Sequence, residues 1–209
     1  MSHPISLRAA ESRAFRKTFD DGLWDMLLAC FVLAYILALY LSPILGDFWS
    51  SMVQVPVWGV AYLAMRLIRK HVVAPRMGAV QFGPARKGRL AKLGTTLLVV
   101  NVLALILGVG AALSFARIPG QVISIVFGML LLLGFSVAAH FLELSRLYLY
   151  GLLMALALPV GEWLWMQGLV SHHGIPMVFG TTSGIMLATG LILFARLMRE
   201  NPLPSQEIP

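Results

Sequence analysis

The sequence predicts an all-α integral membrane protein with six transmembrane helices in one bundle. Hydrophobic residues make up 59% of the 209 residues and charged residues only 12%, whereas soluble domains carry about 45–50% and 25%. The apolar residues gather in runs of about 18 or more, the length that crosses a bilayer as a helix. These runs lack the alternation of apolar and polar residues that strands of a transmembrane barrel require.

The expected spans cover about residues 23–45, 48–69, 95–115, 122–142, 147–166 and 177–197. They form one membrane domain, 23–199, because no polar stretch is long enough to fold separately. A cytoplasmic or interfacial segment, 1–22, precedes this domain, and a polar tail, 200–209, follows it. The apolar spacing over 6–18 predicts a short amphipathic helix on the membrane surface, with a disordered tail as the alternative.

A basic segment between the second and third spans sets the predicted orientation. Residues 66–92 contain no acidic residue and hold half of the 16 lysine and arginine residues of the chain. With both termini cytoplasmic, every lysine and arginine except Arg117 lies in a cytoplasmic segment, as the positive-inside rule requires. The net charge of +7 therefore reflects membrane topology rather than nucleic-acid binding.

We expect this segment to fold on the membrane surface rather than to serve as a plain spacer. Its loop, 70–94, should turn at 75–78, and a short basic helix should start at Pro84 and lead into the third span. The aspartates at the entrance of the first span, Asp20, Asp21 and Asp25, should cap that helix. We predict that the basic segment contacts this acidic region.

Small residues and one amide predict how the spans pack. Ala104, Gly108, Ala112 and Ala116 line one face of the third span, and Gly180, Gly184 and Ala188 line one face of the sixth. Such faces allow close helix approach, and Asn101 is expected to form an interhelical hydrogen bond. The two small faces fit an inverted three-plus-three repeat. The alternative is that the two spans carry similar residues independently, because both meet the same requirements at the membrane interface.

Glu162 is the first candidate for chemistry, because an ionisable group at membrane depth is expensive to bury. It lies near the expected outer end of the fifth span, after Pro159 and Gly161, which should break the helix. A broken helix frees backbone carbonyls that, with a carboxylate, bind a cation or take up a proton. In the alternative, Glu162 simply reaches the outer water past Trp163 and Trp165.

His140, Glu143 and Arg146 form a second candidate cluster, because their spacing of three places them along one helix face. They suggest a proton relay or a head-group site at the cytoplasmic end, against a charge-paired helix end as the alternative. His172 and His173 are adjacent and point apart on a helix, so we expect no metal site. We expect no cofactor.

Docking of an anionic lipid head group or a partner at the cytoplasmic face would use basic side chains: Arg76, Arg86, Lys87, Arg89, Lys92 and Arg146. The chain lacks the phosphate-binding, dinucleotide-binding, serine-hydrolase and zinc-protease motifs of soluble enzymes. Three functions stay open: a transport-related or membrane-complex subunit, a non-catalytic docking protein, and an enzyme acting on lipid head groups. The first is preferred, as a homo-oligomer or with a partner subunit, in a bacterial cytoplasmic membrane.

Overall fold

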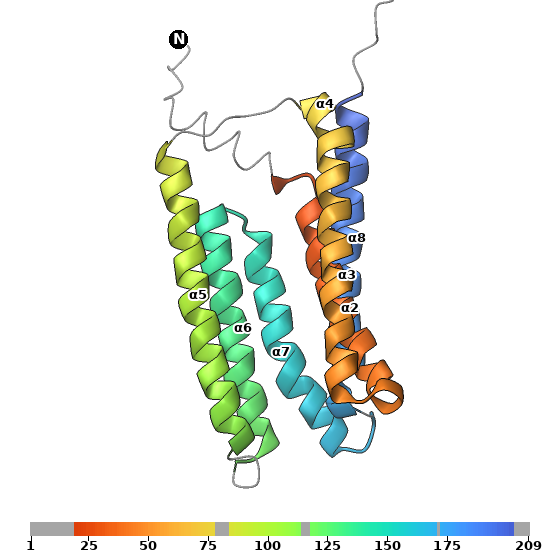
Figure 1. Cartoon of the computed structure of the whole chain (residues 1–209), viewed down its shortest axis with the longest axis vertical. Helices are drawn as coiled ribbons and strands as arrows, with labels where there is room; N and C mark the ends of the chain where they lie inside the picture. Colours follow the sequence, from red (N-terminus) through yellow and green to blue (C-terminus); the bar gives the residue numbers. More distant parts are fainter. Residues whose placement is uncertain (1–18, 78–83, 114–117, 171, 203–209) are drawn as a thin grey trace, which may run out of the picture. The chain divides into compact units, whose positions relative to one another are not determined.

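The computed structural model describes residues 19–77, 84–113, 118–170 and 172–202 (Figure 1). These residues are largely helical and include no strand. Six of the described helices are long and apolar enough to cross a membrane, which confirms the predicted all-α fold with six candidate spans. The expected amphipathic helix at 6–18 lies outside the described residues.

The helices follow the predicted spans in order. They are α2 (Leu23–Leu45), α3 (Asp47–Ile68), the π-helical turn η1 (Arg69–Val73), α4 (Ala74–Met77), α5 (Pro84–Leu113), α6 (Gly120–Leu142), α7 (Arg146–Met166), the 3₁₀ turn η2 (His172–Gly174) and α8 (Ile175–Glu200).

The second and third helices are longer than predicted. Helix α3 continues through η1 and α4 to Met77, so placing 70–77 in a loop was wrong. No glycine interrupts this stretch before Gly78, and a wider π turn precedes Pro75, with the Ala74 amide donating to the Arg69 carbonyl. Helix α5 begins at Pro84, as expected for the basic helix, and runs on without interruption as the third span.

The chain divides into two compact units, residues 1–82 with 183–209 and residues 83–182, and the boundary falls within α8. In the first unit, α2 packs along α3. Its core consists of the buried side chains Leu23, Leu27, Met65, Val73 and Leu197. Helix α8 lies close to the start of α2 where Gly22, the residue before α2, faces Gly190, because a Cβ on either glycine would overlap the backbone at the other.

Polar contacts in the first unit bring three helix ends together. An oxygen of Asp21 lies 2.5 Å from Arg69 Nη2, and the same arginine lies over the Trp24 ring at 5.9 Å. Arg76 Nη1 donates to Met198 Sδ at 2.6 Å. The start of α2, the extension of α3 and the end of α8 therefore share one end of the unit. The predicted contact between the basic segment and the acidic entrance is confirmed at Asp21.

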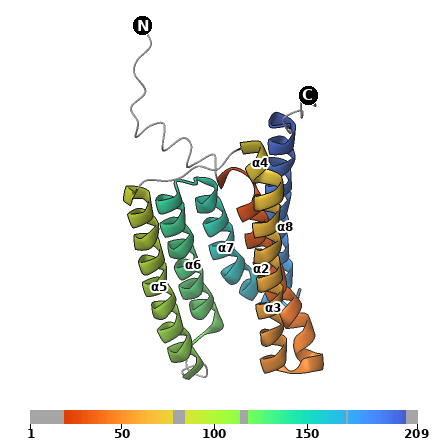
Figure 2. The same ribbon diagram turned by 45° about the horizontal axis from the view of Figure 1, so that its top comes forward.

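In the second unit, α6 packs against both α5 and α7 (Figure 2). A Cβ on Gly151 of α7 would lie 2.6 Å from Phe135 Cβ of α6. Gly108 of the predicted small-residue face does turn towards α6, with Phe127 at 3.6 Å. Gly151 thus sets the spacing of α6 from α7, whereas a Cβ at Gly108 would make only an ordinary contact with α6.

Two packing predictions were wrong. The Asn101 side chain is exposed and donates to the Leu97 carbonyl of its own helix at 2.8 Å, because an amide four residues on reaches that carbonyl without a second helix. On α8, Gly184 has open space where a Cβ would stand, and the close approach is made by Gly190 instead. The four-residue spacing of small side chains correctly indicated that a glycine of α8 contacts another helix, but it did not identify which glycine.

Candidate functional site

Glu162 lies about one turn before the end of α7 and is 7% exposed. The predicted helix break at Pro159 is wrong, since α7 runs continuously from Arg146 to Met166. Proline has no N–H, so it leaves the carbonyl four residues earlier, at Ala155, without its intrahelical donor. Gly128 of α6 packs at that point: a Cβ there would lie 2.5 Å from the Ala155 carbonyl oxygen. Close packing by α6 therefore covers the defect that the proline creates.

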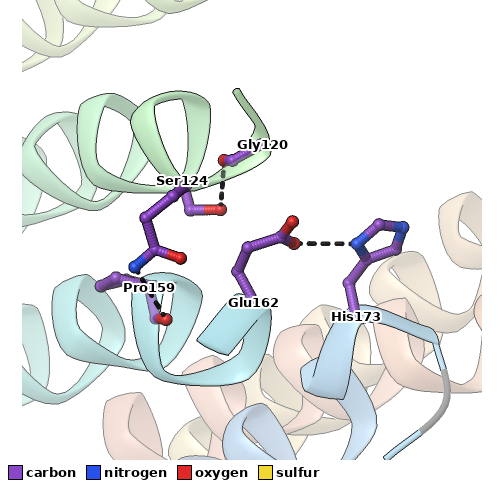
Figure 3. Close-up of polar contacts among 6 residues, drawn as sticks. Gly120, Ser124, Pro159, Glu162 and His173 are labelled. Atoms are coloured by element: carbon purple, nitrogen blue, oxygen red, sulfur yellow. Dashed lines mark hydrogen bonds and ion pairs between the residues drawn. The ribbon is translucent and has the colours of Figure 1, made fainter. Parts of the chain in front are cut away.

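The partner of Glu162 is His173, whose Nδ1 lies 2.8 Å from Glu162 Oε2 (Figure 3). The two side chains differ in their access to solvent: 9% of the glutamate side chain is exposed and 47% of the histidine side chain. The imidazole also packs on the Trp165 ring, with 4.1 Å between the ring centroids and a tilt of 34°. A buried carboxylate is thus joined to a half-exposed titratable ring.

Backbone geometry places His173 at this position. His173 and Gly174 both adopt the left-handed conformation, with φ of 52° and 64°. A Cβ on Gly174 would lie 2.6 Å from the Gly161 carbonyl oxygen, and one on Gly161 would lie 2.7 Å from the His173 carbonyl oxygen. The turn η2 therefore lies directly on the backbone of α7, and only glycine fits on either side.

The start of α6 closes the other side of the carboxylate. A Cβ on Gly120, the first residue of α6, would overlap Glu162 Oε1. The first amides of a helix carry a partial positive charge, which favours a carboxylate beside them. Nearby, Gln121 Nε2 donates to the Pro159 carbonyl at 3.5 Å and Ser124 Oγ donates to the Gly120 carbonyl at 2.9 Å. Polar groups of α6, α7 and η2 thus meet at one end of the unit.

Sequence reasoning found Glu162 but missed its pairing with His173. The signal was present, because the fifth span was expected to end just after Glu162 and His173 lies in the short turn that follows. Two groups at the same end of consecutive spans share one membrane interface. On sequence grounds, His173 is considered only as a metal ligand. No group of three or more histidine, cysteine, aspartate or glutamate side chains comes together in the described part of the chain.

The second predicted cluster is arranged differently from expectation. Helix α6 ends at Leu142, Glu143 takes a left-handed conformation with φ of 58°, and α7 begins at Arg146. His140, Glu143 and Arg146 therefore do not lie along one helix face, and that prediction was wrong. Glu143 Oε1 instead lies 2.5 Å from Arg89 Nη1 of α5. This ion pair connects the start of α5 with the α6–α7 turn.

The predicted docking residues are distributed over both units. Arg89 is occupied by Glu143 and also donates to the His140 carbonyl at 2.9 Å. Arg76 contacts Met198 in the first unit, whereas the Lys92 side chain on α5 is exposed. The side chains of Arg86 and Lys87 lie outside the described part of the structure. Within the second unit, the predicted docking residues 86, 87, 89 and 92 all lie on α5, and the side chains described there are those of Arg89 and Lys92.

No protein-family model, curated protein or solved structure matches the chain.

Proposed function

We propose that this chain is a transport-related membrane protein, or the subunit of a membrane complex, in which Glu162 takes up and releases a proton. The observation that carries the proposal is the 2.8 Å pair between this buried carboxylate and the half-exposed His173 at the end of an apolar helix. In the orientation that the positive-inside rule favours, both termini are cytoplasmic and the pair lies at the outer end of the fifth span.

The physical reason is the cost of charge at this depth. On insertion scales an ionised carboxylate without a partner costs about 2.5–3.5 kcal/mol at the centre of a membrane helix, and less towards the helix end, where Glu162 lies. A hydrogen bond from the imidazole at 2.8 Å and the amides at the start of α6 offset that cost. The buried carboxylate therefore depends on its contact with His173.

The donor set also favours a proton over a metal ion. Zinc sites in proteins use three or four side-chain ligands, and Glu162 meets one imidazole and no second carboxylate within the described residues. Calcium needs six or more oxygens. One carboxylate and one imidazole are sufficient for proton exchange, because both groups titrate and they already share a hydrogen bond.

A chain of this size is expected to need a second copy or a partner to enclose a pathway. The spans α3 and α5 carry long rows of exposed apolar side chains, among them Trp58, Leu63, Leu98 and Leu105. These surfaces suit lipid or another helix equally well. We propose a homo-oligomer or a complex with a partner subunit, in which part of this apolar surface packs against another helix.

The test is proton movement in vesicles. Purified protein is reconstituted with a pH-sensitive dye inside, a pH gradient is applied, and the initial rate of dye response is compared with that of Glu162→Gln. The matched control is Glu200→Gln, because Glu200 forms an exposed pair with Arg196 at the end of α8. We expect flux in the parent and in the control and its loss in Glu162→Gln. Equal rates in vesicles with and without protein would rule out transport.

A second proposal, docking of anionic lipid, is supported by the exposed side chains of Lys92 on α5 and Arg66 on α3. Each basic residue near an anionic leaflet contributes about 1 kcal/mol. Retention of phosphatidylglycerol after detergent washing should fall in Lys92→Ala and Arg66→Ala. Retention equal to that of the parent would contradict the docking proposal.

An enzyme acting on lipid head groups is less well supported. The carboxylate of Glu143, which such an enzyme would use as an acid or base, is already paired with Arg89.

A further inference from the structure

We propose that His173 is the relay that passes protons between water and Glu162, an inference that rests on the proposed function. One nitrogen of the imidazole ring, Nδ1, forms a hydrogen bond with the Glu162 carboxylate. Its second nitrogen, Nε2, lies on the opposite side of the ring. Since 47% of the histidine side chain is exposed against 9% of the glutamate side chain, the imidazole lies between the buried acid and solvent.

The proton transfer can be written in balanced steps. Neutral His173 starts with its proton on Nδ1, donating to the Glu162 carboxylate. Nε2 then takes a proton from a hydronium ion and releases water, which makes the ring an imidazolium. The Nδ1 proton moves to Glu162, which leaves a neutral carboxylic acid and the Nε2–H tautomer of histidine. The ring is reset by a turn about the Cβ–Cγ bond: Nδ1 takes a proton from a hydronium ion, Nε2–H then passes its proton to water, and the Nδ1–H tautomer turns back to Glu162.

The fold supports the ring in the manner that such a relay requires. The contact between Gly161 and Gly174 fixes the turn, and the Trp165 ring, at 4.1 Å, supports one face of the imidazole. From α7 the titratable group facing His173 is Glu162. From α6 the carboxylate meets Gly120, which carries no charge. Among the described contacts, the ring's ionic partner is therefore the acid that it would serve.

A purely structural role makes different demands on position 173. It needs a residue that accepts φ of 52° and donates one hydrogen bond to Glu162. Asparagine meets both demands, since it tolerates the left-handed region and carries an amide N–H, but it cannot pass on a proton. His173→Asn thus keeps the turn and removes the relay. His173→Gly also accepts the backbone angle and leaves space for a free imidazole molecule.

The experiment follows protonation of Glu162 directly, in detergent micelles, by time-resolved infrared spectroscopy after a drop in pH. The signal is the carbonyl band of a protonated carboxylic acid that is present in the parent and absent in Glu162→Gln. We expect the band to form about 100-fold more slowly in His173→Asn and His173→Gly, the size typical of a lost acid–base group. Added imidazole should restore the rate in His173→Gly only, and His172→Ala should behave as the parent.

Two results would overturn the relay, and they are distinguishable. Parental rates in His173→Asn, or no response of His173→Gly to imidazole, would remove the relay and leave Glu162 as the proton site. Absence of a Glu162-dependent band in the parent would overturn the proposed function and the relay with it. Near-ultraviolet circular dichroism of each variant confirms that the compared proteins are folded.

Discussion

Gly161 of α7 and Gly174 of η2 meet backbone to backbone: a Cβ on Gly174 would lie 2.6 Å from the Gly161 carbonyl oxygen. The residue before Gly174 is His173, and the residue after Gly161 is Glu162. A contact between two glycines therefore sets the distance between the two side chains that form the candidate site. The site depends on backbone positions that carry no functional group themselves.

Replacing Gly174 by alanine should displace the turn η2 from α7. Alanine at φ of 64° costs about 1–2 kcal/mol for the left-handed conformation alone, and its Cβ would overlap the Gly161 carbonyl. We expect a total loss of about 3 kcal/mol, within the range for overpacking added to backbone strain. The measurement is the thermal unfolding midpoint in detergent, together with the Glu162 infrared band.

Gly168 supplies the matched control for this substitution. It also has a positive φ, 71°, but nothing lies within 4 Å of its would-be Cβ. Gly168→Ala should therefore cost only the backbone strain, about 1–2 kcal/mol, and leave the Glu162 band unchanged. Equal losses in the two variants would show that the contact between Gly161 and Gly174 contributes nothing beyond the backbone angle.

Gly190→Ala should separate α2 from α8 in the first unit. Its Cβ would lie 2.8 Å from the Gly22 carbonyl oxygen and 2.7 Å from Met26 Cγ. The methionine can turn aside, but the backbone oxygen cannot, so we expect a loss of about 2 kcal/mol. Unfolding in detergent measures this change.

Gly184→Ala on the same helix is the control for Gly190→Ala. Position 184 has open space, and alanine is favoured over glycine inside a helix by roughly 0.5–1 kcal/mol. We expect this variant to be as stable as the parent or more so. A lower midpoint for Gly184→Ala than for Gly190→Ala would contradict the helix contact described at Gly22.

Arg69→Ala should destabilise the first unit, because it leaves the Asp21 carboxylate, with 1% of its side chain exposed, without the guanidinium. Removing one partner of a fully buried pair costs about 3–5 kcal/mol. Since 30% of the Arg69 side chain is exposed, water can replace part of the interaction, and we expect about 2 kcal/mol. Chemical unfolding of the variant in mixed micelles is the measurement.

The exposed pair between Arg196 and Glu200 on α8 is the comparison for Arg69→Ala. Exposure is 71% for the arginine side chain and 58% for the glutamate side chain, and exposed ion pairs contribute little. Arg196→Ala should therefore have the same unfolding midpoint as the parent protein. A loss as large as that of Arg69→Ala would mean that burial does not separate the two pairs.

The six helices were predictable because length and apolar content alone decide whether a helix can cross a bilayer. The end of the second helix was not, since residues 70–77 are polar enough for a loop and contain Pro75. Only the backbone shows that a π turn at Arg69–Val73 carries the helix on to Met77. Hydropathy reports where a helix must be apolar, and it says little about how far the helix extends beyond the membrane.

The candidate site was predictable as far as Glu162, because a lone carboxylate in an apolar run is conspicuous. Its partner was not, since the position of His173 depends on the left-handed backbone at 173–174 and on the contact with Gly161. Likewise, the spacing of His140, Glu143 and Arg146 suggested one helix face, but the chain turns at Glu143. Long-range contacts and positive φ angles of residues other than glycine leave no periodic pattern in a sequence.

Glu143 combines a left-handed backbone, φ of 58°, with the ion pair to Arg89. Glu143→Gly relieves the backbone by about 1 kcal/mol and removes a partly buried pair of similar value. In a protein that already carries Arg89→Ala there is no ion pair to lose, so Glu143→Gly only relieves the backbone strain. The substitution should therefore be more favourable by about 1 kcal/mol in the Arg89→Ala background than in the parent, as a double-mutant cycle measures.

The cycle separates the ion pair from everything else that Glu143 contacts, because those other contacts are lost in both backgrounds and cancel. Its four proteins are compared by unfolding in the same detergent. A coupling of zero would mean that the 2.5 Å contact between Arg89 and Glu143 contributes no stability. The start of α5 would then be held by the Arg89 bond to the His140 carbonyl and by packing alone. A positive coupling would show that the ion pair itself ties α5 to the turn between α6 and α7.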